Sequence, residues 1–258
     1  AKFLKENHFL VGVSLDGTEF TNDLFRVDSG GKGTFEKIME GIGQLKEFQV
    51  DFNILTVVNA MTAKKISRIY DFYKQSGFFY LQFIPCLNPL GKEGERFAYT
   101  LTPDAYGKFL KTLFDLWYND WKEGNIIHIQ QFEEYIKMLL LMPPDVCGMS
   151  GTCSYQHVVE ADGEVYPCDF YVLDEYKLGN LSQVSFAEIN EKREKIHFIE
   201  ESAVMHEACG GCRYAAICRG GCRRHRVPKN YFCSSYYDFF EYTIHRLEEM
   251  AGWFRENC

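Results

Sequence analysis

Cysteine is the residue type that most constrains what this chain can fold into. Ten cysteines occur in 258 residues, and eight of them lie in one block that begins at Cys147 and ends at Cys233. Such crowding has three common causes, which are a disulfide framework, structural zinc or iron–sulfur clusters. The eight crowded cysteines are Cys147, Cys153, Cys168, Cys209, Cys212, Cys218, Cys222 and Cys233.

The composition argues against a disulfide framework. Such frameworks stabilise small secreted domains that cannot build an adequate apolar core. Here 46% of the residues are hydrophobic, and the first residues show no secretory signal pattern. We therefore expect reduced thiols and a cytoplasmic protein. No apolar run approaches the roughly 20 residues of a membrane-spanning helix, and the net charge of −8 argues against nucleic acid as a partner.

Zinc and iron–sulfur clusters are harder to separate from the residues alone. Cys209-x2-Cys212 is typical of a zinc knuckle, and eight thiolates are enough for two tetrahedral zinc ions. The other spacings are long and irregular, which suits a cubane cluster with one thiolate for each iron. The segment from Cys209 to Cys233 contains no Asp or Glu, and its cations could balance a negatively charged cluster or form a surface for an acidic partner. These cations are Arg213, Arg219, Arg223, Arg224, Arg226 and Lys229.

The segment before Cys147 alternates between strand-like and helix-like stretches. Alternation of apolar strands with amphipathic helices predicts a parallel sheet covered by helices, here with three strand–helix units. After a short helix over Ala1–Asn7, the expected strands are His8–Ser14, Val50–Val58 and Phe78–Ile84, and the expected helices are Thr34–Phe48, Ala63–Gln75 and Pro103–Lys122. The stretch Leu87–Tyr99 is expected to be a loop.

The cysteine-rich part shows a different pattern. Ser154–Val159 and Glu164–Tyr166 flank an Asp-Gly turn and are predicted to form a β-hairpin. Two helices are expected on either side of the last cysteines, over Ser185–Arg193 and Tyr236–Arg255. This part is therefore predicted to be a mostly irregular α+β domain.

The cysteine spacing resembles the SPASM signature of radical S-adenosylmethionine (SAM) enzymes. The signature covers Cys153-x9-Gly163-x4-Cys168, then Cys209-x2-Cys212-x5-Cys218-x3-Cys222, then Cys233. The residues around Cys147, Cys168 and Cys222 are similar to those of the anaerobic sulfatase-maturating enzymes. The resemblance to these enzymes extends over essentially the whole chain. The resemblance implies two auxiliary 4Fe–4S clusters with interleaved ligands. One set is Cys147, Cys153, Cys168 and Cys222, and the other is Cys209, Cys212, Cys218 and Cys233.

The same resemblance implies a fold and a SAM site. Residues 1–142 would be the C-terminal half of a partial (β/α)6 radical SAM barrel, and residues 143–258 the SPASM domain with a C-terminal helix. Ser14 and Arg26, in segments similar to the family's SAM-binding elements, would contact the SAM carboxylate, and Leu87 would lie along the adenosine. Thr18 and Asn22 depart from the family's Pro and His at their positions.

One family feature is missing. Radical SAM enzymes hold the SAM-cleaving cluster, a third 4Fe–4S cluster, on Cys-x3-Cys-x2-Cys, whereas only Cys86 precedes Cys147 here. We expect that this stretch is truncated, rather than a relative that has lost radical chemistry, and that it is inactive alone. Half a barrel would also leave a sheet edge exposed, which favours association. Cys86 and Cys258 are expected to be core residues or free thiols.

The resemblance finally implies a reaction. A Cys or Ser in a Cys/Ser-x-Pro/Ala-x-Arg motif of a sulfatase would be oxidised to formylglycine, with Asp169 as the base that removes a proton. A flavodoxin or ferredoxin would be the electron donor. The alternative function is a non-catalytic zinc- or cluster-binding module that recognises a peptide or regulates a partner.

Overall fold

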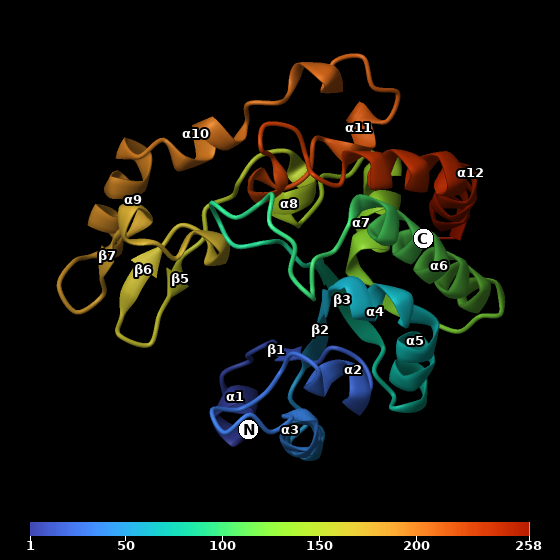
Figure 1. Ribbon diagram of the computed structural model, residues 1–258, viewed down its shortest axis with the longest axis horizontal. Helices are drawn as coiled ribbons and strands as arrows, with labels where there is room; N and C mark the ends of the chain where they lie inside the picture. Colours follow the sequence, from blue (N-terminus) through green and yellow to red (C-terminus); the bar gives the residue numbers. More distant parts are fainter. Residues whose placement is uncertain (258) are drawn as a thin grey trace. The chain divides into compact units, whose positions relative to one another are not determined.

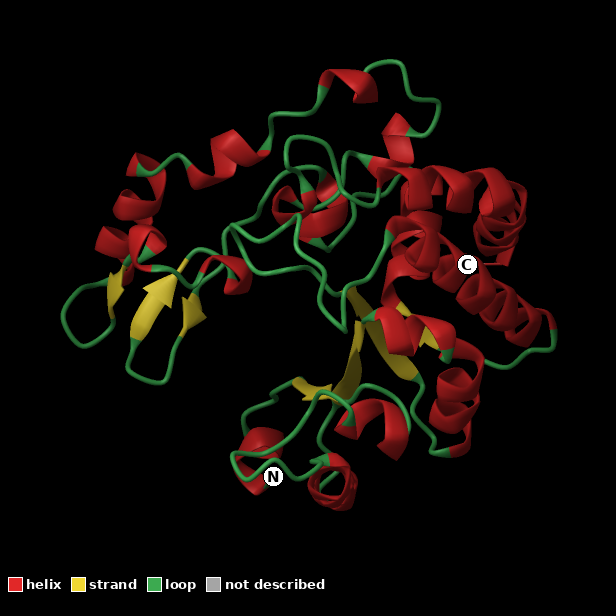
Figure 2. Cartoon of the chain, viewed as in Figure 1, coloured by secondary structure: helices red, strands yellow, loops and turns green. Residues whose placement is uncertain are grey.

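The structure is a computed structural model that describes residues 1–257 and consists of two compact units. The first unit comprises Ala1–Leu140 and the C-terminal helix from Ser234 on, and the second comprises Leu141–Cys233. The chain has a mixed α/β fold, with one sheet in each unit (Figures 1 and 2). No helix among residues 1–257 combines the length and apolar character needed to cross a bilayer.

A four-stranded parallel sheet forms the centre of the first unit, in the order β1-β2-β3-β4. Because the strands follow chain order, successive crossovers place the connecting helices on one face of the sheet (Figure 1). Its elements are α1 (Lys2–Glu6), β1 (Val11–Ser14), α2 (Glu19–Asp23), α3 (Phe35–Glu47), β2 (Phe52–Val58), α4 (Ala60–Lys64), α5 (Ile66–Gln75), β3 (Tyr80–Pro85), α6 (Pro103–Lys122), β4 (His128–Ile129), α7 (Gln130–Leu139) and α12 (Cys233–Asn257).

The core of the first unit explains why its elements form. Leu15, which directly follows β1, and the β2 residues Ile54 and Val58 are almost fully buried, which accounts for the apolar composition of these segments. Helix α6 begins where Thr102 caps it and proline occupies its first turn, so the predicted bounds Pro103–Lys122 are confirmed. Its buried residue Phe109 contacts Phe83 of β3, with ring centroids 5.6 Å apart.

The sequence predicted three strand–helix units, whereas the sheet has a fourth strand, β4. Strand β4 has only two residues, which is too short to give an alternating pattern, and the following helix α7 was not predicted either. β1, β2 and β3 each begin two or three residues later than expected, and a residue with a left-handed backbone lies shortly before each of them: His8, Gln49 and Gly77, with φ of 55°, 54° and 68°. Lys65 separates α4 from α5, where one helix was expected.

Helix α12 belongs to the first unit, although the sequence-based division places it with the cysteine-rich domain. Phe239 stacks on Phe132 of α7 at 5.6 Å, and Arg246 donates a hydrogen bond of 2.7 Å to Asp115 of α6. Ser235 also donates to the carbonyl oxygen of Pro103 at 2.6 Å. The apolar face of α12 is therefore buried against α6 and α7.

The second unit has a small antiparallel sheet of order β5-β6-β7 and little other regular structure. The predicted hairpin is confirmed, with Gly163 in its turn, and β7 is an added third strand. Its elements are α8 (Cys147–Ser150), β5 (Val158–Val159), β6 (Glu164–Tyr166), the 3₁₀ helices η1 (Asp169–Tyr171) and η2 (Asp174–Tyr176), β7 (Gly179–Asn180), α9 (Phe186–Lys195), α10 (Phe198–Ser202), η3 (Glu207–Cys209), α11 (Ala215–Cys218) and η4 (Arg223–His225). Val165, Leu178 and Ile189 form its small apolar core.

Candidate metal centre

Four thiols of the second unit form what we call the first thiol group: Cys147, Cys153, Cys168 and Cys222. Besides burial, the nearby Cys147 and Cys153 raise the pKa of the Cys222 thiol, and Cys222 in turn raises the pKa of Cys168. They come from separate places: the start of α8, the turn after it, the residue before η1 and the residue before η4. The structure thus brings together cysteines that are far apart in the sequence.

The remaining four cysteines of the block form the second thiol group: Cys209, Cys212, Cys218 and Cys233. The Cys218 thiol interacts electrostatically with each of the other three. Cys209 ends η3, Cys218 ends α11, and Cys233 begins α12. The family resemblance assigns the same two sets of four cysteines as ligands, and their binding of clusters stays a prediction.

A left-handed backbone segment separates Cys218 from Cys222. Arg219, Gly220 and Gly221 have φ of 50°, 74° and 70° in succession. Glycine is needed in this segment, because a Cβ on Gly221 would lie 2.4 Å from Nδ2 of Asn230. This reversal ends α11 and directs the chain from the second thiol group to the first.

Arg226 holds the loops around the first thiol group together. Its guanidinium donates hydrogen bonds to five backbone carbonyl oxygens, at distances of 2.5 to 3.3 Å. These carbonyls belong to Gly151, Ser202, Val204, Gly220 and Gly221. The sequence suggested that Arg226 balances cluster charge. The structure shows that it fixes the backbone between the cysteines, and its role in balancing the charge of a cluster stays a prediction.

Burial and hydrogen bonding act in opposite directions on the thiols. Burial raises the pKa of Cys168 to about 12, although the Phe170 backbone N–H donates to its sulfur. Burial likewise raises the pKa of Cys222 and of Cys218 to about 11, against N–H donation from Arg224 and Gly220 respectively. These thiols are therefore protonated at neutral pH, and a bound metal would displace their protons.

The free cysteines can be compared with the ligand arrangements of a single metal ion and of a four-iron cluster. All nine cysteines among residues 1–257 are free, so no disulfide links the described part of the chain. In that part, no three His, Cys, Asp or Glu side chains are close enough to hold a single metal ion. Zinc needs its four ligands about 2.3 Å from one centre, whereas a cubane places one thiolate on each of four separate irons. Two sets of four thiols equal in number the cysteine ligands of two cubane clusters. Cys258 lies outside the described residues.

Asp169 lies directly beside the first thiol group. It begins η1, is exposed to solvent, and its Oδ1 accepts a hydrogen bond of 3.3 Å from the Cys168 thiol. A carboxylate that is open to solvent can exchange a proton with a bound partner. This placement is compatible with the predicted role as a base.

The predicted SAM contacts lie in the first unit. Ser14 is the last residue of β1, and Leu87 follows β3 by two residues. Because β1 and β3 both run parallel to β2, their carboxyl ends meet at the same edge of the sheet. Ligands of parallel α/β sheets bind outside that edge. Ser14 is exposed and Leu87 is half-buried.

Arg26 has a partner that the sequence did not reveal. Its Nε and Nη2 donate to the two carboxylate oxygens of buried Asp16, at 2.7 and 3.2 Å. Asp16 also accepts from the Val57 backbone N–H at 2.8 Å. The Nε and Nη2 side of the guanidinium is therefore engaged by Asp16, and the N–H groups on its Nη1 side are the ones that could face a ligand. The sequence signal that could have indicated this ion pair was the polar pattern Ser14-Leu15-Asp16 at the end of a strand.

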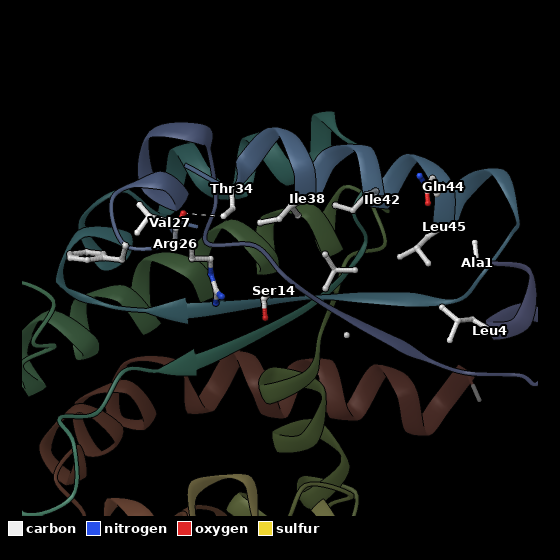
Figure 3. Close-up of a pocket in the computed structure, with 14 residues that line it drawn as sticks. Ala1, Leu4, Ser14, Arg26, Val27, Thr34, Ile38, Ile42, Gln44 and Leu45 are labelled. Atoms are coloured by element: carbon white, nitrogen blue, oxygen red, sulfur yellow. Dashed lines mark hydrogen bonds between the residues drawn. The ribbon is translucent and has the colours of Figure 1, made fainter. Parts of the chain in front are cut away.

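A cavity of about 840 Å³ lies beside β1 and contains both predicted carboxylate contacts (Figure 3). Arg26 and Ser14 are neighbours in this view, and Thr34, whose hydroxyl donates to the Arg26 carbonyl oxygen, lies beside Arg26. Apolar residues of α3, including Ile38 and Ile42, line the rest. The cavity thus offers a cation and hydroxyls beside an apolar wall.

Comparison with known proteins agrees with this geometry. The model of the SPASM family, described as an iron–sulfur cluster-binding domain, matches residues 147–213. The chain is 46% identical over 259 residues to a cysteine-type anaerobic sulfatase-maturating enzyme of Clostridium perfringens, covering 98% of this chain and 70% of the relative. It is 30% identical to a serine-type enzyme of Bacteroides thetaiotaomicron, covering 96% of this chain and 65% of that relative.

Solved structures extend the similarity to the fold. A structure described as native anSMEcpe with bound AdoMet and Cp18Cys peptide is 44% identical, with a TM-score of 0.91, over 97% of this chain and 72% of that chain. A polyhistidine-tagged form with bound AdoMet matches with the same TM-score. Both units of the chain thus have counterparts in a protein that binds AdoMet and a peptide.

Proposed function

The chain belongs to the anaerobic sulfatase-maturating enzymes, which are radical SAM enzymes with an iron–sulfur SPASM domain, and from this we propose that it is the auxiliary-cluster and substrate-binding portion of such an enzyme. The reaction would oxidise a Cys or Ser of a sulfatase to formylglycine. The observation that carries the proposal is the division of eight thiols into two groups of four.

Each thiol group would hold one 4Fe–4S cluster. Cys147, Cys153, Cys168 and Cys222 are the proposed ligands of one, and the second thiol group supplies those of the other. When bound, such clusters accept or donate single electrons. The chain's own contribution is to desolvate the sulfurs and to fix the loops through Arg226. Because reduced thiols are typical of cytoplasmic proteins, the proposal includes a cytoplasmic location.

The first unit would be the C-terminal part of a partial (β/α)6 barrel that binds SAM. The chain-order parallel sheet supports this fold, since consecutive barrel strands are neighbours. Ser14 and the N–H groups of Arg26 that do not donate to Asp16 would bind the SAM carboxylate, and Leu87 would lie along the adenosine. These 258 residues contain no Cys-x3-Cys-x2-Cys, so the chain alone would not cleave SAM.

Asp169 would take a proton from the substrate Cys or Ser. Its carboxylate now accepts a hydrogen bond from the Cys168 thiol. A Cys168 thiolate held on iron would have no proton to donate, so the Asp169 carboxylate would be free to accept one from the substrate. The proposed partners are a sulfatase segment with the Cys/Ser-x-Pro/Ala-x-Arg motif and a flavodoxin or ferredoxin as electron donor. Nucleic acid and membranes have no role in this proposal.

Metal analysis of the chain tests the proposal. The protein is purified and reconstituted without oxygen, and iron, sulfide and zinc are measured for each chain. About eight irons and eight sulfides, as two cubanes require, would support the proposal. Stoichiometric zinc without iron would replace it with a zinc-binding module that recognises a peptide. Variant Cys86→Ala is the matched control, because Cys86 belongs to neither thiol group and should leave the iron content unchanged.

Activity requires a separate experiment. The complete reading frame is supplied with SAM, a reductant and a sulfatase peptide that contains the Cys/Ser-x-Pro/Ala-x-Arg motif. Formation of an aldehyde in the peptide, detected by mass spectrometry, would support sulfatase maturation. Cleavage of SAM by the 258-residue chain alone would contradict the proposal that this stretch lacks initiating chemistry.

A further inference from the structure

A side-chain amide is directed at one sulfur of the first thiol group. Nε2 of Gln156 lies 3.7 Å from Sγ of Cys147 and 3.4 Å from Oγ of Ser154. A thiolate can only accept hydrogen bonds, so the amide presents its N–H groups and not its oxygen to a metal-bound sulfur. Gln156 is not among the cysteine ligands, and no sequence pattern indicated that it approaches one.

The backbone of Gln156 is held by a deeply buried arginine. Nη2 of Arg193 donates to the Gln156 carbonyl oxygen, and only 1% of Arg193 is exposed. The Arg193 guanidinium also lies over the ring of Tyr155, 5.0 Å from its centroid. Arg193 is itself fixed by helix α9, which Ser185 and Glu188 cap at its start. The backbone that carries the amide is therefore anchored to helix α9 through Arg193.

The contact is one of several hydrogen bonds around the first thiol group. The backbone N–H groups of Phe170 and Arg224 donate to the sulfurs of Cys168 and Cys222, and the Cys153 backbone N–H donates to Oγ of Ser202 at 2.7 Å. Gln156 provides the contact to the sulfur of Cys147. Backbone donors cannot be removed by substitution, whereas the amide of Gln156 can.

We propose that Gln156 is a positioning residue whose side-chain amide stabilises the Cys147 thiolate and raises the reduction potential of the iron–sulfur cluster held by the first thiol group. Reduction adds one electron to the cluster, and part of the added negative charge is carried by the ligand sulfurs. A hydrogen bond to such a sulfur is stronger in the reduced form, so it favours electron uptake. This inference rests on the proposed function, since it requires a cluster at these thiols.

The test is a reductive titration of the reconstituted 258-residue chain, with dithionite as the electron source and paramagnetic resonance as the readout. Wild type is compared with Gln156→Leu and Gln156→Met, which keep the size of the side chain but lack the N–H donor. We expect both variants to retain all iron, and one of the two midpoint potentials to become more negative. The expected shift is up to about tenfold in the ratio of oxidised to reduced cluster, which is about 59 mV for one electron. Ser154→Ala, which removes only the other partner of the amide, should leave both potentials unchanged.

The outcomes separate this inference from the proposed function. Unchanged potentials in both variants, with iron retained, would overturn the role of Gln156 while leaving the two clusters in place. Loss of iron from both variants would also overturn it, because Gln156 would then be needed for assembly rather than for tuning. A wild-type chain without two cubane clusters would refute the proposed function instead. Equal shifts of both potentials would contradict the assignment to the first thiol group.

Discussion

Cys218 and Cys222 are separated by only three residues, yet their thiols belong to different groups. The left-handed segment Arg219–Gly221 is the physical cause, because it reverses the chain between them. One short loop therefore joins both proposed metal sites, and a defect at one site can be transmitted to the other through the backbone.

This relationship predicts unequal effects of two cysteine substitutions. Cys222→Ala should remove the iron of the first thiol group and weaken the second, since the loop that leaves Cys218 loses its anchor. Cys218→Ala should affect mainly the second group and leave about four of the eight irons that two cubanes contain. Iron and sulfide analysis after anaerobic reconstitution measures the difference. Full iron content in Cys222→Ala would show that it is not a ligand.

Gly221 should be essential for this loop. Gly221→Ala places a Cβ 2.4 Å from Nδ2 of Asn230 and keeps a left-handed backbone with φ of 70°. Asn230 donates to the Gly220 carbonyl oxygen at 3.0 Å, so a shift of its side chain would break that hydrogen bond. We expect the free energy of unfolding of the metal-free protein to fall by about 1–3 kcal/mol. Chemical denaturation measures it.

Gly211→Ala is the matched control for Gly221→Ala. Gly211 also lies between two cysteines of the block, but a Cβ there would meet nothing within 4 Å. Its stability should stay close to wild type. Equal losses in the two variants would mean that backbone conformation at Gly221 is not what matters.

Arg226 should contribute more to stability than a surface arginine. Arg226→Met keeps much of the side-chain volume but removes hydrogen bonds to five carbonyl oxygens. Because hydrogen bonds from a charged donor contribute about 1.5–3 kcal/mol, we expect a loss of at least that size in the free energy of unfolding. Lys229→Met, at an exposed position three residues away, should change stability little. A similar loss in both variants would indicate a general effect of charge.

The sequence predicted those helices and turns that depend on residues adjacent in the chain. The proline in the first turn and the apolar periodicity predicted both bounds of α6, and the Asp-Gly turn predicted the hairpin of β5 and β6. Local pattern could not reveal contacts made through the backbone of distant loops. Arg226 bonds a carbonyl 75 residues away at Gly151, and no residue type at Gly151 encodes that contact. The division of the eight cysteines into two groups was predicted from a family resemblance. Cysteine spacing alone does not show that the chain reverses between Cys218 and Cys222.

Acid should weaken the first unit through Asp120. Burial opposes its charge, but hydrogen bonds from Lys74 and Tyr70 outweigh burial and hold the pKa of this carboxyl below its usual 3.8. A depressed pKa contributes stability above the unfolded value and loses it as the pH falls through the folded value. Asp120→Asn should therefore be less stable than wild type near pH 7, and the difference should shrink below pH 3.8. Urea denaturation across this range measures it.

The control for Asp120→Asn is Asp104→Asn. Asp104 pairs with Lys108, and both side chains are about three-quarters exposed, at 75% and 72%. Exposed pairs contribute little, so this variant should differ little from wild type at any pH. A difference for Asp120→Asn that stays constant with pH would show that the substitution acts through packing and not through charge.

Asp169→Asn should separate metal binding from proton transfer. Asparagine keeps the size of the side chain and an oxygen that can accept a hydrogen bond, so the first thiol group should still bind its full complement of iron. It cannot take up a proton, and general-base catalysis typically contributes about 10²–10⁴-fold to a rate. We therefore expect the complete enzyme to lose about that much aldehyde formation on a sulfatase peptide. Asp174→Asn, which changes another exposed carboxylate in the next 3₁₀ helix, is the control and should retain activity. Wild-type turnover by Asp169→Asn would remove Asp169 as the base, and loss of iron would assign it to cluster assembly instead.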